Sequence, residues 1–225
     1  FPTRRSSDLQ KINKPNKPNK LKQSKNPLKT EPPKKVRIIG GNWRSRLLTV
    51  LDLPGLRPTT DRIRETLFNW LGQDLSGLRC LDVFAGSGAL GFEAASRNAA
   101  LVELIEKNKN TFLNLTLNHQ NLHSYPAAGQ ITLLQADGLR FLKAQAAGSW
   151  DLIFLDPPFQ EPQLLVDAAK EAGRACTSSP QSAIYIECPL STDKANLISA
   201  LQNWTCVKEL AIGQTLALLF RATSG

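Results

Sequence analysis

The chain has 225 residues, a hydrophobic fraction of 41% and a formal net charge of +9, values typical of a globular protein with a basic segment. No apolar run approaches the ~18 residues that a membrane-spanning helix requires, and the polar, basic start does not resemble a secretion signal, so a membrane or secreted protein is not expected. The four cysteines show no C-x-x-C spacing and there are only two histidines, which predicts reduced thiols, a cytoplasmic protein and no metal site.

The positive charge is concentrated at the N-terminus. Residues 1–37 contain twelve Lys or Arg against two acidic residues, whereas the remainder of the chain is nearly neutral. Residues 1–35 contain few apolar side chains and repeated prolines, so we expect a disordered basic leader. Residues 1–9 resemble the translation of a sequencing adapter and are interpreted as an artefact of sequence assembly. The lysines that follow fit either a solubilising tail or an arm that binds a polyanion.

Residues 36–72 predict a small N-terminal element made of a β-hairpin and a helix. Short strands are expected at 36–39 and 46–50, around a glycine-rich turn. A helix is expected from about 61 to 71, because Ile63, Leu67 and Leu71 fall on one face and Thr59 or Thr60 can cap it. The arginines of this segment form either a solvated face or a surface that contacts phosphates beside an active site. They are Arg37, Arg44, Arg46, Arg57, Arg62 and Arg64.

From residue 73 to residue 225 the pattern alternates between strands and helices, which predicts an α/β domain. Strands are expected at 79–84, 100–106, 131–135, 151–155 and 182–187, and helices near 88–97, 108–118, 138–147, 163–175 and 192–203. Two further strands, 205–212 and 215–221, read as a C-terminal hairpin. The whole predicts a mixed sheet with one antiparallel strand.

A glycine-rich stretch, Gly86-Ser-Gly-Ala-Leu-Gly91, follows the first of these strands. Glycines at a strand-to-helix turn let a ligand approach the backbone, although the G-x-G-x-x-G pattern alone is weak. Asp82 could meet an ammonium group or cap the strand end, and Glu106 could hold two ribose hydroxyls. NAD and S-adenosylmethionine both carry such a ribose, but only the second has an amino-acid head for Asp82. Asp137 could equally meet the adenine amine or cap the next helix.

Asp156-Pro-Pro-Phe159 ends the fourth predicted strand of the domain and is the most specific signal. An exocyclic base amine is a poor nucleophile because its lone pair is delocalised into the ring. The Asp156 carboxylate and the Pro157 carbonyl could accept its two hydrogens and orient the lone pair, while Phe159 stacks on the base. The target base would have to be unpaired or flipped out of a helix.

The glycine-rich stretch together with Asp156-Pro-Pro-Phe159 resembles the amino-methyltransferases that use S-adenosylmethionine. The upstream stretches 37–44 and 56–69 resemble the RsmD family, and the resemblance covers residues 36–221. It implies methylation of the exocyclic N2 of a guanine in 16S ribosomal RNA. It also implies a Rossmann-like class I methyltransferase fold, with a mostly parallel seven-stranded sheet preceded by a small β-hairpin and helix.

By position, the resemblance also implies the roles of individual residues. The cofactor would be held by Asp82, Phe84, Gly86, Gly88, Glu106, Asp137 and Thr59. The target guanine would be held by Asp156, Pro157, Pro158 and Phe159. The RNA would be contacted by Arg37, Arg44, Arg57, Arg62 and Arg64. The expected partner is ribosomal RNA within an assembling small subunit, and nothing indicates more than a monomer.

Three other functions remain open at this point. An adenine-N6 methyltransferase acting on DNA or RNA would use the same Asp-Pro-Pro-aromatic stretch. A non-enzymatic RNA-binding assembly factor could retain the fold, although the intact Gly86, Glu106 and Asp156 argue against it. An NAD dehydrogenase would leave the stretch at 156–159 unexplained.

Overall fold

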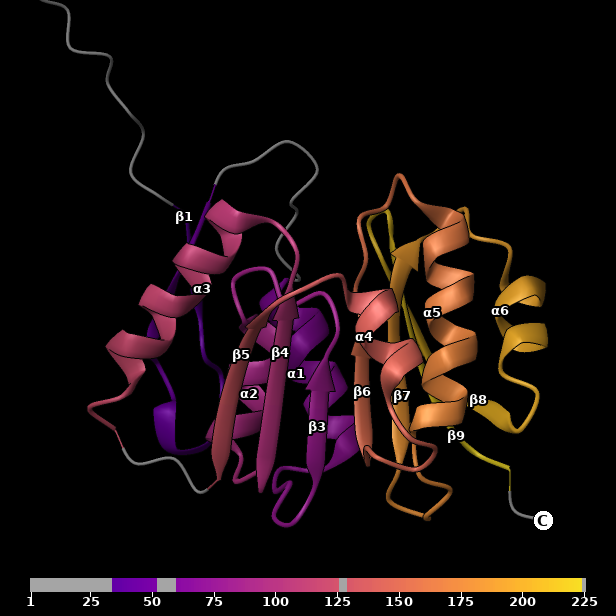
Figure 1. The fold of residues 1–225 in the computed structure, drawn as a ribbon, viewed down its shortest axis with the longest axis horizontal. Coiled ribbons are helices and arrows are strands. Elements are labelled where there is room, and N and C mark those ends of the chain that lie inside the picture. The colour runs from indigo at the N-terminus through magenta and orange to yellow at the C-terminus, as the bar shows by residue number, and fades with distance from the viewer. Residues whose placement is uncertain (1–33, 52–59, 126–128, 224–225) are drawn as a thin grey trace, which may run out of the picture. The chain divides into compact units, whose positions relative to one another are not determined.

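The protein is represented by a computed structural model that describes residues 34–51, 60–125 and 129–223. These residues belong to one unit, which spans 33–225 and is built on a seven-stranded sheet of order β5-β4-β3-β6-β7-β9-β8 (Figure 1). The strands are β3 (Arg79–Asp82), β4 (Leu101–Glu106), β5 (Gln130–Gln135), β6 (Leu152–Leu155), β7 (Ala183–Pro189), β8 (Trp204–Ile212) and β9 (Thr215–Ala222). Among the described residues, β9 runs antiparallel to both of its neighbours, β7 and β8, whereas the pairs that join β3, β4, β5, β6 and β7 are parallel. The predicted mostly parallel, seven-stranded sheet is therefore confirmed.

Helices cover both faces of the sheet, three on each. They are α1 (Asp61–Leu71), α2 (Ala89–Ser96) and α3 (Lys109–Leu122) on one face, and α4 (Gly138–Ala144), α5 (Pro162–Ala175) and α6 (Lys194–Ala200) on the other. Successive side chains of a strand point to opposite faces. Accordingly Phe154 packs in the core beneath α1–α3, whereas Ile153 packs beneath α4–α6. Burial on both faces explains why these strands read as continuous apolar runs.

The N-terminal element is a two-stranded hairpin of β1 (Lys34–Arg37) and β2 (Leu47–Val50), with the short 3₁₀ helix η1 (Gly41–Trp43) between them. The first strand was expected at 36–39 but spans 34–37, so Lys34 and Lys35, which were assigned to the disordered leader, belong to the hairpin. The strand ends earlier because the N–H groups of Ile39 and Gly40 donate to the Glu93 carboxylate of α2, at 2.7 and 2.8 Å. The turn at Gly41 has φ +71° and lies so close to the Ser96 carbonyl that an added Cβ would overlap it. The Gly-Gly turn therefore fixes the hairpin on α2.

Most remaining boundaries match the expectations to within a few residues. The α1 helix has the predicted bounds, and the Thr60 hydroxyl accepts from the Ile63 N–H at its start. The largest difference is α3, which continues to Leu122 instead of residue 118. The buried Leu122 and the stacking of His119 on Phe92 anchor the additional turn. None of the helices in the described part of the chain is both long and apolar enough to cross a bilayer.

Candidate active site

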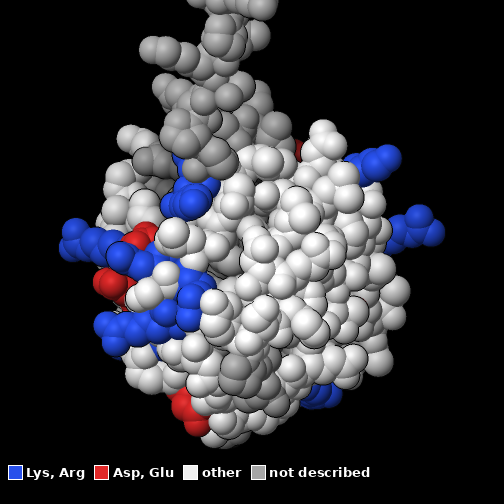
Figure 2. Space-filling model, turned by 90° about the vertical axis from the view of Figure 1, so that its left-hand side faces the viewer, with Lys and Arg blue, Asp and Glu red and all other residues white. Residues whose placement is uncertain are grey.

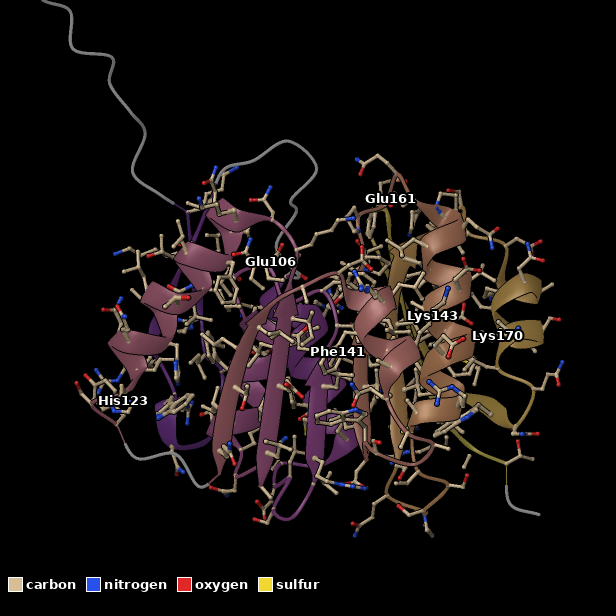
Figure 3. All side chains as sticks on the ribbon, in the orientation of Figure 1. Glu106, His123, Phe141, Lys143, Glu161 and Lys170 are labelled. Carbon is tan, nitrogen blue, oxygen red and sulfur yellow. The ribbon has the colours of Figure 1, made fainter. Side chains whose placement is uncertain are left out.

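A cavity of about 460 Å³ opens at the carboxyl ends of the parallel strands, beyond β3, β4, β5 and β6. Ligands of open α/β sheets bind at this edge. The described residues that line the cavity are Val83, Phe84, Gly86, Glu106, Lys107, Asn108, Thr111, Asp137, Gly138, Asp156, Pro157, Pro158, Phe159, Gln160, Glu161 and Leu164. Figure 3 shows two of them, Glu106 and Glu161, at the same upper end of the sheet. The structure thus brings both sequence motifs to one site.

The glycine-rich turn forms one wall of this cavity. Gly86 has φ +54°, and an added Cβ would meet no atom within 4 Å, so its backbone faces open space in a left-handed conformation that favours glycine. Phe84 and Gly86 line the cavity as expected, whereas Gly88 is buried at the start of α2 and is not among the lining residues. The turn therefore leaves room for a ligand to lie against its backbone.

Asp82 lies beneath the glycine-rich turn. Its side chain is 2% exposed, its Oδ2 accepts from the Gly91 N–H at 2.9 Å, and it is not among the described residues lining the cavity. Burial raises the pKa of this carboxyl to about 7. The geometry matches the strand-end alternative, because the carboxyl holds the first turn of α2 against the end of β3.

Glu106 ends β4 and holds two loops together at the cavity wall. Its Oε2 accepts from the Gly86 N–H at 3.0 Å, and its Oε1 accepts from the Asn108 N–H at 2.6 Å. Burial raises the pKa of Glu106, while these two N–H groups oppose that shift by favouring the charged form. A carboxylate has about four acceptor positions. Two backbone bonds therefore orient Glu106 and leave capacity for ligand hydroxyls.

Asp137 follows β5 and caps α4, because its Oδ1 accepts from the Arg140 N–H at 3.0 Å. Its Oδ2 lies 2.9 Å from the Lys107 ammonium. The Arg140 N–H and Lys107 together lower the pKa of Asp137 and keep it charged. Of the two roles that the sequence left open, capping is present in the structure, and the same side chain also lines the cavity.

The stretch from Asp156 to Phe159 forms the opposite wall. Asp156 follows the fully buried β6 directly, and Pro157 is buried while Pro158 is exposed. The Pro158 carbonyl accepts from the Glu161 N–H at 3.1 Å, and Pro162 then begins α5. The carboxylate is therefore fixed between a rigid strand and a rigid turn, with the half-buried Phe159 ring beside it.

Several lining residues were not identified from the sequence. They are Val83, Lys107, Asn108, Thr111, Gly138, Gln160, Glu161 and Leu164. The sequence did hold a signal for Asn108, which is a polar residue two positions after the strand-end carboxylate of Glu106. In the structure, the Asn108 Oδ1 accepts from the N–H groups of Asn110 and Thr111 at the start of α3. Residues directly after a parallel strand are candidates for a ligand site.

The charge of the cavity discriminates between cofactors. Among the described residues that line it, Glu106, Asp137, Asp156 and Glu161 are acidic and only Lys107 is basic, and that lysine is paired with Asp137. A dinucleotide would bring a doubly charged pyrophosphate against this excess of carboxylates, which is unfavourable. A cofactor with a cationic sulfonium and ammonium matches the site instead.

The exposed arginines of the N-terminal element lie outside this cavity. Arg37, Arg44 and Arg62 are exposed, and Arg37 pairs with Asp61 at 3.3 Å. Figure 2 looks onto the left-hand side of Figure 1 and shows a largely uncharged face, with Lys and Arg gathered along one side and a few more at the opposite and lower edges. Arg57 and Thr59 lie outside the described residues.

Arg64 corrects one expectation, because its side chain is fully buried and does not belong to an exposed RNA surface. Its guanidinium donates to the Arg37 carbonyl and to Asp61, both at 2.7 Å, and lies 3.7 Å from Glu93. Its position in α1 explains the difference, because Arg64 lies beside Ile63 on the buried face of the helix. Arg64 links the hairpin to α1 and α2.

Comparisons with known proteins show which family the chain resembles. Residues 36–221 match the family model described as conserved hypothetical protein 95. The chain is 40% identical to ribosomal RNA small subunit methyltransferase D of Escherichia coli over 189 residues, which cover 83% of this chain and 90% of the relative. The same enzyme of Haemophilus influenzae is 41% identical, with 80% and 90% covered. The solved structure of the Escherichia coli yhhF protein superposes with a TM-score of 0.70 at 36% identity, covering 84% of this chain and 99% of that one.

Proposed function

The chain belongs to the family described as conserved hypothetical protein 95, the family of the small-subunit ribosomal RNA methyltransferases D, and we propose that it methylates the exocyclic N2 amine of a guanine in small-subunit ribosomal RNA. As a methyltransferase of this family it uses S-adenosylmethionine. The observation that carries the proposal is the convergence of Glu106 and the turn at 156–159 on one acidic cavity. Substrate and cofactor would meet there at the carboxyl edge of the sheet.

The residues present fit this cofactor. The open backbone at Gly86 provides space, Glu106 retains acceptor capacity for two ribose hydroxyls, and the excess of carboxylates favours a cation. Asp137 and Phe84 would border the adenine, and Thr59 would belong to a lid. Asp82 would support the cofactor site indirectly, because it accepts from the Gly91 N–H and so holds the start of α2. Gly88 precedes the first residue of that helix. When bound, S-adenosylmethionine supplies an electrophilic methyl group on a positively charged sulfur.

Asp156 would orient the nucleophile. Its carboxylate and the Pro157 carbonyl would accept the two N2 hydrogens and direct the nitrogen lone pair out of the ring plane. As the nitrogen gains positive charge, the fixed carboxylate stabilises it more strongly than in the ground state. Phe159 would stack on the extruded guanine, and Pro157 and Pro158 keep the turn rigid. After transfer the nitrogen loses one proton, which passes to solvent.

Binding of the RNA would involve Arg37, Arg44 and Arg62 together with Arg57. Phosphate contacts of this kind position a substrate without reading its sequence. The substrate would be ribosomal RNA within an assembling small subunit, and the enzyme would act as a cytoplasmic monomer. Residues 1–33 would be a basic leader, 34–72 the RNA-contacting and lid element, which includes β1, and 73–225 the catalytic domain.

The experiment that tests the proposal is nucleoside mass spectrometry. Unmethylated small-subunit ribosomal RNA, both naked and in partly assembled subunits, is incubated with the protein and isotopically labelled S-adenosylmethionine. We expect label in N2-methylguanosine. Label in N6-methyladenosine would replace the proposal by the adenine alternative, and no label with either substrate would favour the non-enzymatic assembly factor.

A further inference from the structure

Asp156 has a second carboxylate beside it, on the neighbouring strand. The strands β6 and β7 run parallel, and their pairing ends with Leu155 opposite Ile186. The residues that follow this pair are Asp156 after β6 and Glu187 in β7. Neighbouring strands lie about 4.8 Å apart. Because Phe154 and Tyr185 pack in the same core, the residues two positions further on point to that same face. The two carboxylates therefore lie side by side at the carboxyl edge.

Glu187 is held in place by a buried tyrosine. Its side chain is only 3% exposed, and the Tyr185 hydroxyl donates to its Oε1 at 2.8 Å. Burial raises the pKa of Tyr185 well above its ordinary value, and the negative charges of Glu187 and, to a lesser degree, Asp156 add to that shift. The charges of both carboxylates thus help to keep the Tyr185 hydroxyl protonated. Burying a carboxylate costs free energy of folding, so the buried Glu187 is a candidate for a functional residue.

The turn that follows Asp156 separates two cavities. On one side of the turn lies the cofactor cavity described above. Pro157, Pro158 and Phe159 also line a second cavity of about 350 Å³, and Glu187 lines that second cavity with them. Asp156 lines the first cavity and Glu187 the second, so the two carboxylates flank the turn, and the edge of a base held there would meet both.

Guanine and adenine differ in what they present beside the reacting amine. Guanine carries the N1–H donor next to its N2 amine, whereas adenine carries the N1 acceptor next to its N6 amine. We propose that Glu187 selects guanine by accepting the N1–H while Asp156 holds the N2 amine. An adenine in the same position would set its N1 lone pair against the carboxylate, so the same residue rejects the competing base. This inference rests on the proposed function and supplies its base specificity.

The first test uses the unmodified protein. The target guanosine, located by fragment mass spectrometry, is replaced in the RNA by 2-aminopurine, which keeps the reacting amine but has an acceptor at N1. Loss of a hydrogen bond to a buried charged group predicts a kcat/KM at least about tenfold lower for 2-aminopurine. Equal values for the two bases would overturn the inference, because the N1–H would then not be read.

The second test attributes the discrimination to Glu187. Glu187→Gln keeps the size of the side chain but adds an N–H donor that an N1 acceptor can use. We expect the ratio of kcat/KM for guanine over 2-aminopurine to fall at least about tenfold. The matched control is Glu103→Gln, a half-buried carboxylate of β4 that lines neither cavity, which should leave the ratio unchanged. Tyr185→Phe, which removes the orienting hydroxyl, should lower the ratio by a smaller factor.

The two proposals fail in different ways. If the unmodified protein forms no N2-methylguanosine, the proposed function is wrong. If it forms N2-methylguanosine and a folded Glu187→Gln variant keeps the wild-type ratio, only the inference about Glu187 is wrong. Folding is checked by thermal melting and by S-adenosylmethionine affinity. Should Glu187→Gln not fold, the ratio in Tyr185→Phe decides, and an unchanged ratio there contradicts the inference.

Discussion

Asp82 and Glu106 end neighbouring strands, but the structure gives their carboxyl groups different surroundings. Asp82 is enclosed beneath the glycine-rich turn, whereas Glu106 reaches the cavity and accepts two backbone N–H groups. The sequence located both at strand ends, and the role proposed for Glu106 agrees with its position. It could not show that Asp82 is covered, because that depends on how closely α2 packs on β3. Individual roles at a site are thus less predictable than its place in the fold.

The buried Asp82 predicts a pH dependence of stability. Its pKa is raised from 3.8 to about 7 in the folded protein. Between about pH 4 and pH 7 the folded state therefore holds a proton that the unfolded chain has released, and the free energy of unfolding falls as the pH rises through this window. Asp82→Asn removes this proton while keeping an acceptor for the Gly91 N–H. In urea unfolding, the free energy of unfolding of the wild type should fall by about 2–3 kcal/mol relative to that of Asp82→Asn as the pH rises from about 5 to about 8. Parallel pH profiles for the two proteins would contradict this assignment.

Glu106 leads to a prediction for cofactor affinity. A carboxylate that accepts two ribose hydroxyls makes charge-assisted hydrogen bonds, each worth roughly 1.5–3 kcal/mol. Glu106→Ala should therefore weaken S-adenosylmethionine binding at least about tenfold, as measured by calorimetry. Glu103→Ala on the same strand lies outside the cavity and serves as the control. A folded Glu106→Ala protein with wild-type affinity would remove Glu106 from the site.

At the scale of elements, α2 connects the N-terminal hairpin to the glycine-rich turn. Glu93 of α2 is fully buried and accepts from Ile39, from Gly40 and from the Arg97 guanidinium, at 2.7 to 2.9 Å. The strands and helices themselves were predictable, because their apolar periodicity is local. The contact from Glu93 to the hairpin spans more than fifty residues of sequence, and no local pattern reports such a pairing.

This cluster predicts a large effect on stability. Glu93→Ala leaves the buried guanidinium of Arg97 and two backbone N–H groups without their acceptor, and removing one partner of a buried ion pair costs about 3–5 kcal/mol. We expect a loss of that size in the free energy of unfolding. Glu171→Ala, which removes the partly exposed pair with Arg174, should cost less than about 1 kcal/mol. Similar losses for the two variants would contradict a special role for Glu93.

At the scale of the whole molecule, charge is divided between a basic N-terminus and a nearly neutral remainder. The neutral remainder carries the candidate site, while we propose that the lysines of the first 33 residues add affinity for RNA. Sequence composition alone established this division. The position of the reacting centre required the fold, because it depends on which strands become neighbours.

Removing residues 1–33 separates the two contributions. Lysine contacts to phosphate make RNA binding steeply dependent on salt. The shortened protein should bind ribosomal RNA more weakly at low salt and with a shallower slope of log K against log salt, as measured by filter binding. Turnover at saturating RNA should be retained. Identical slopes for the two proteins would show that the basic leader does not contact the RNA.

The central claim is that Asp156, fixed between β6 and the turn at 156–159, orients the amine that receives the methyl group. The most direct measurement is single-turnover methyl transfer to small-subunit ribosomal RNA at saturating S-adenosylmethionine. Losing one such electrostatic contact costs about 10²–10³-fold in rate. We predict a loss of this size for Asp156→Ala, a smaller loss for Asp156→Asn, and little change in cofactor affinity for either. A wild-type rate in Asp156→Ala would contradict the claim, and a parallel loss of cofactor binding would place Asp156 in the cofactor site instead.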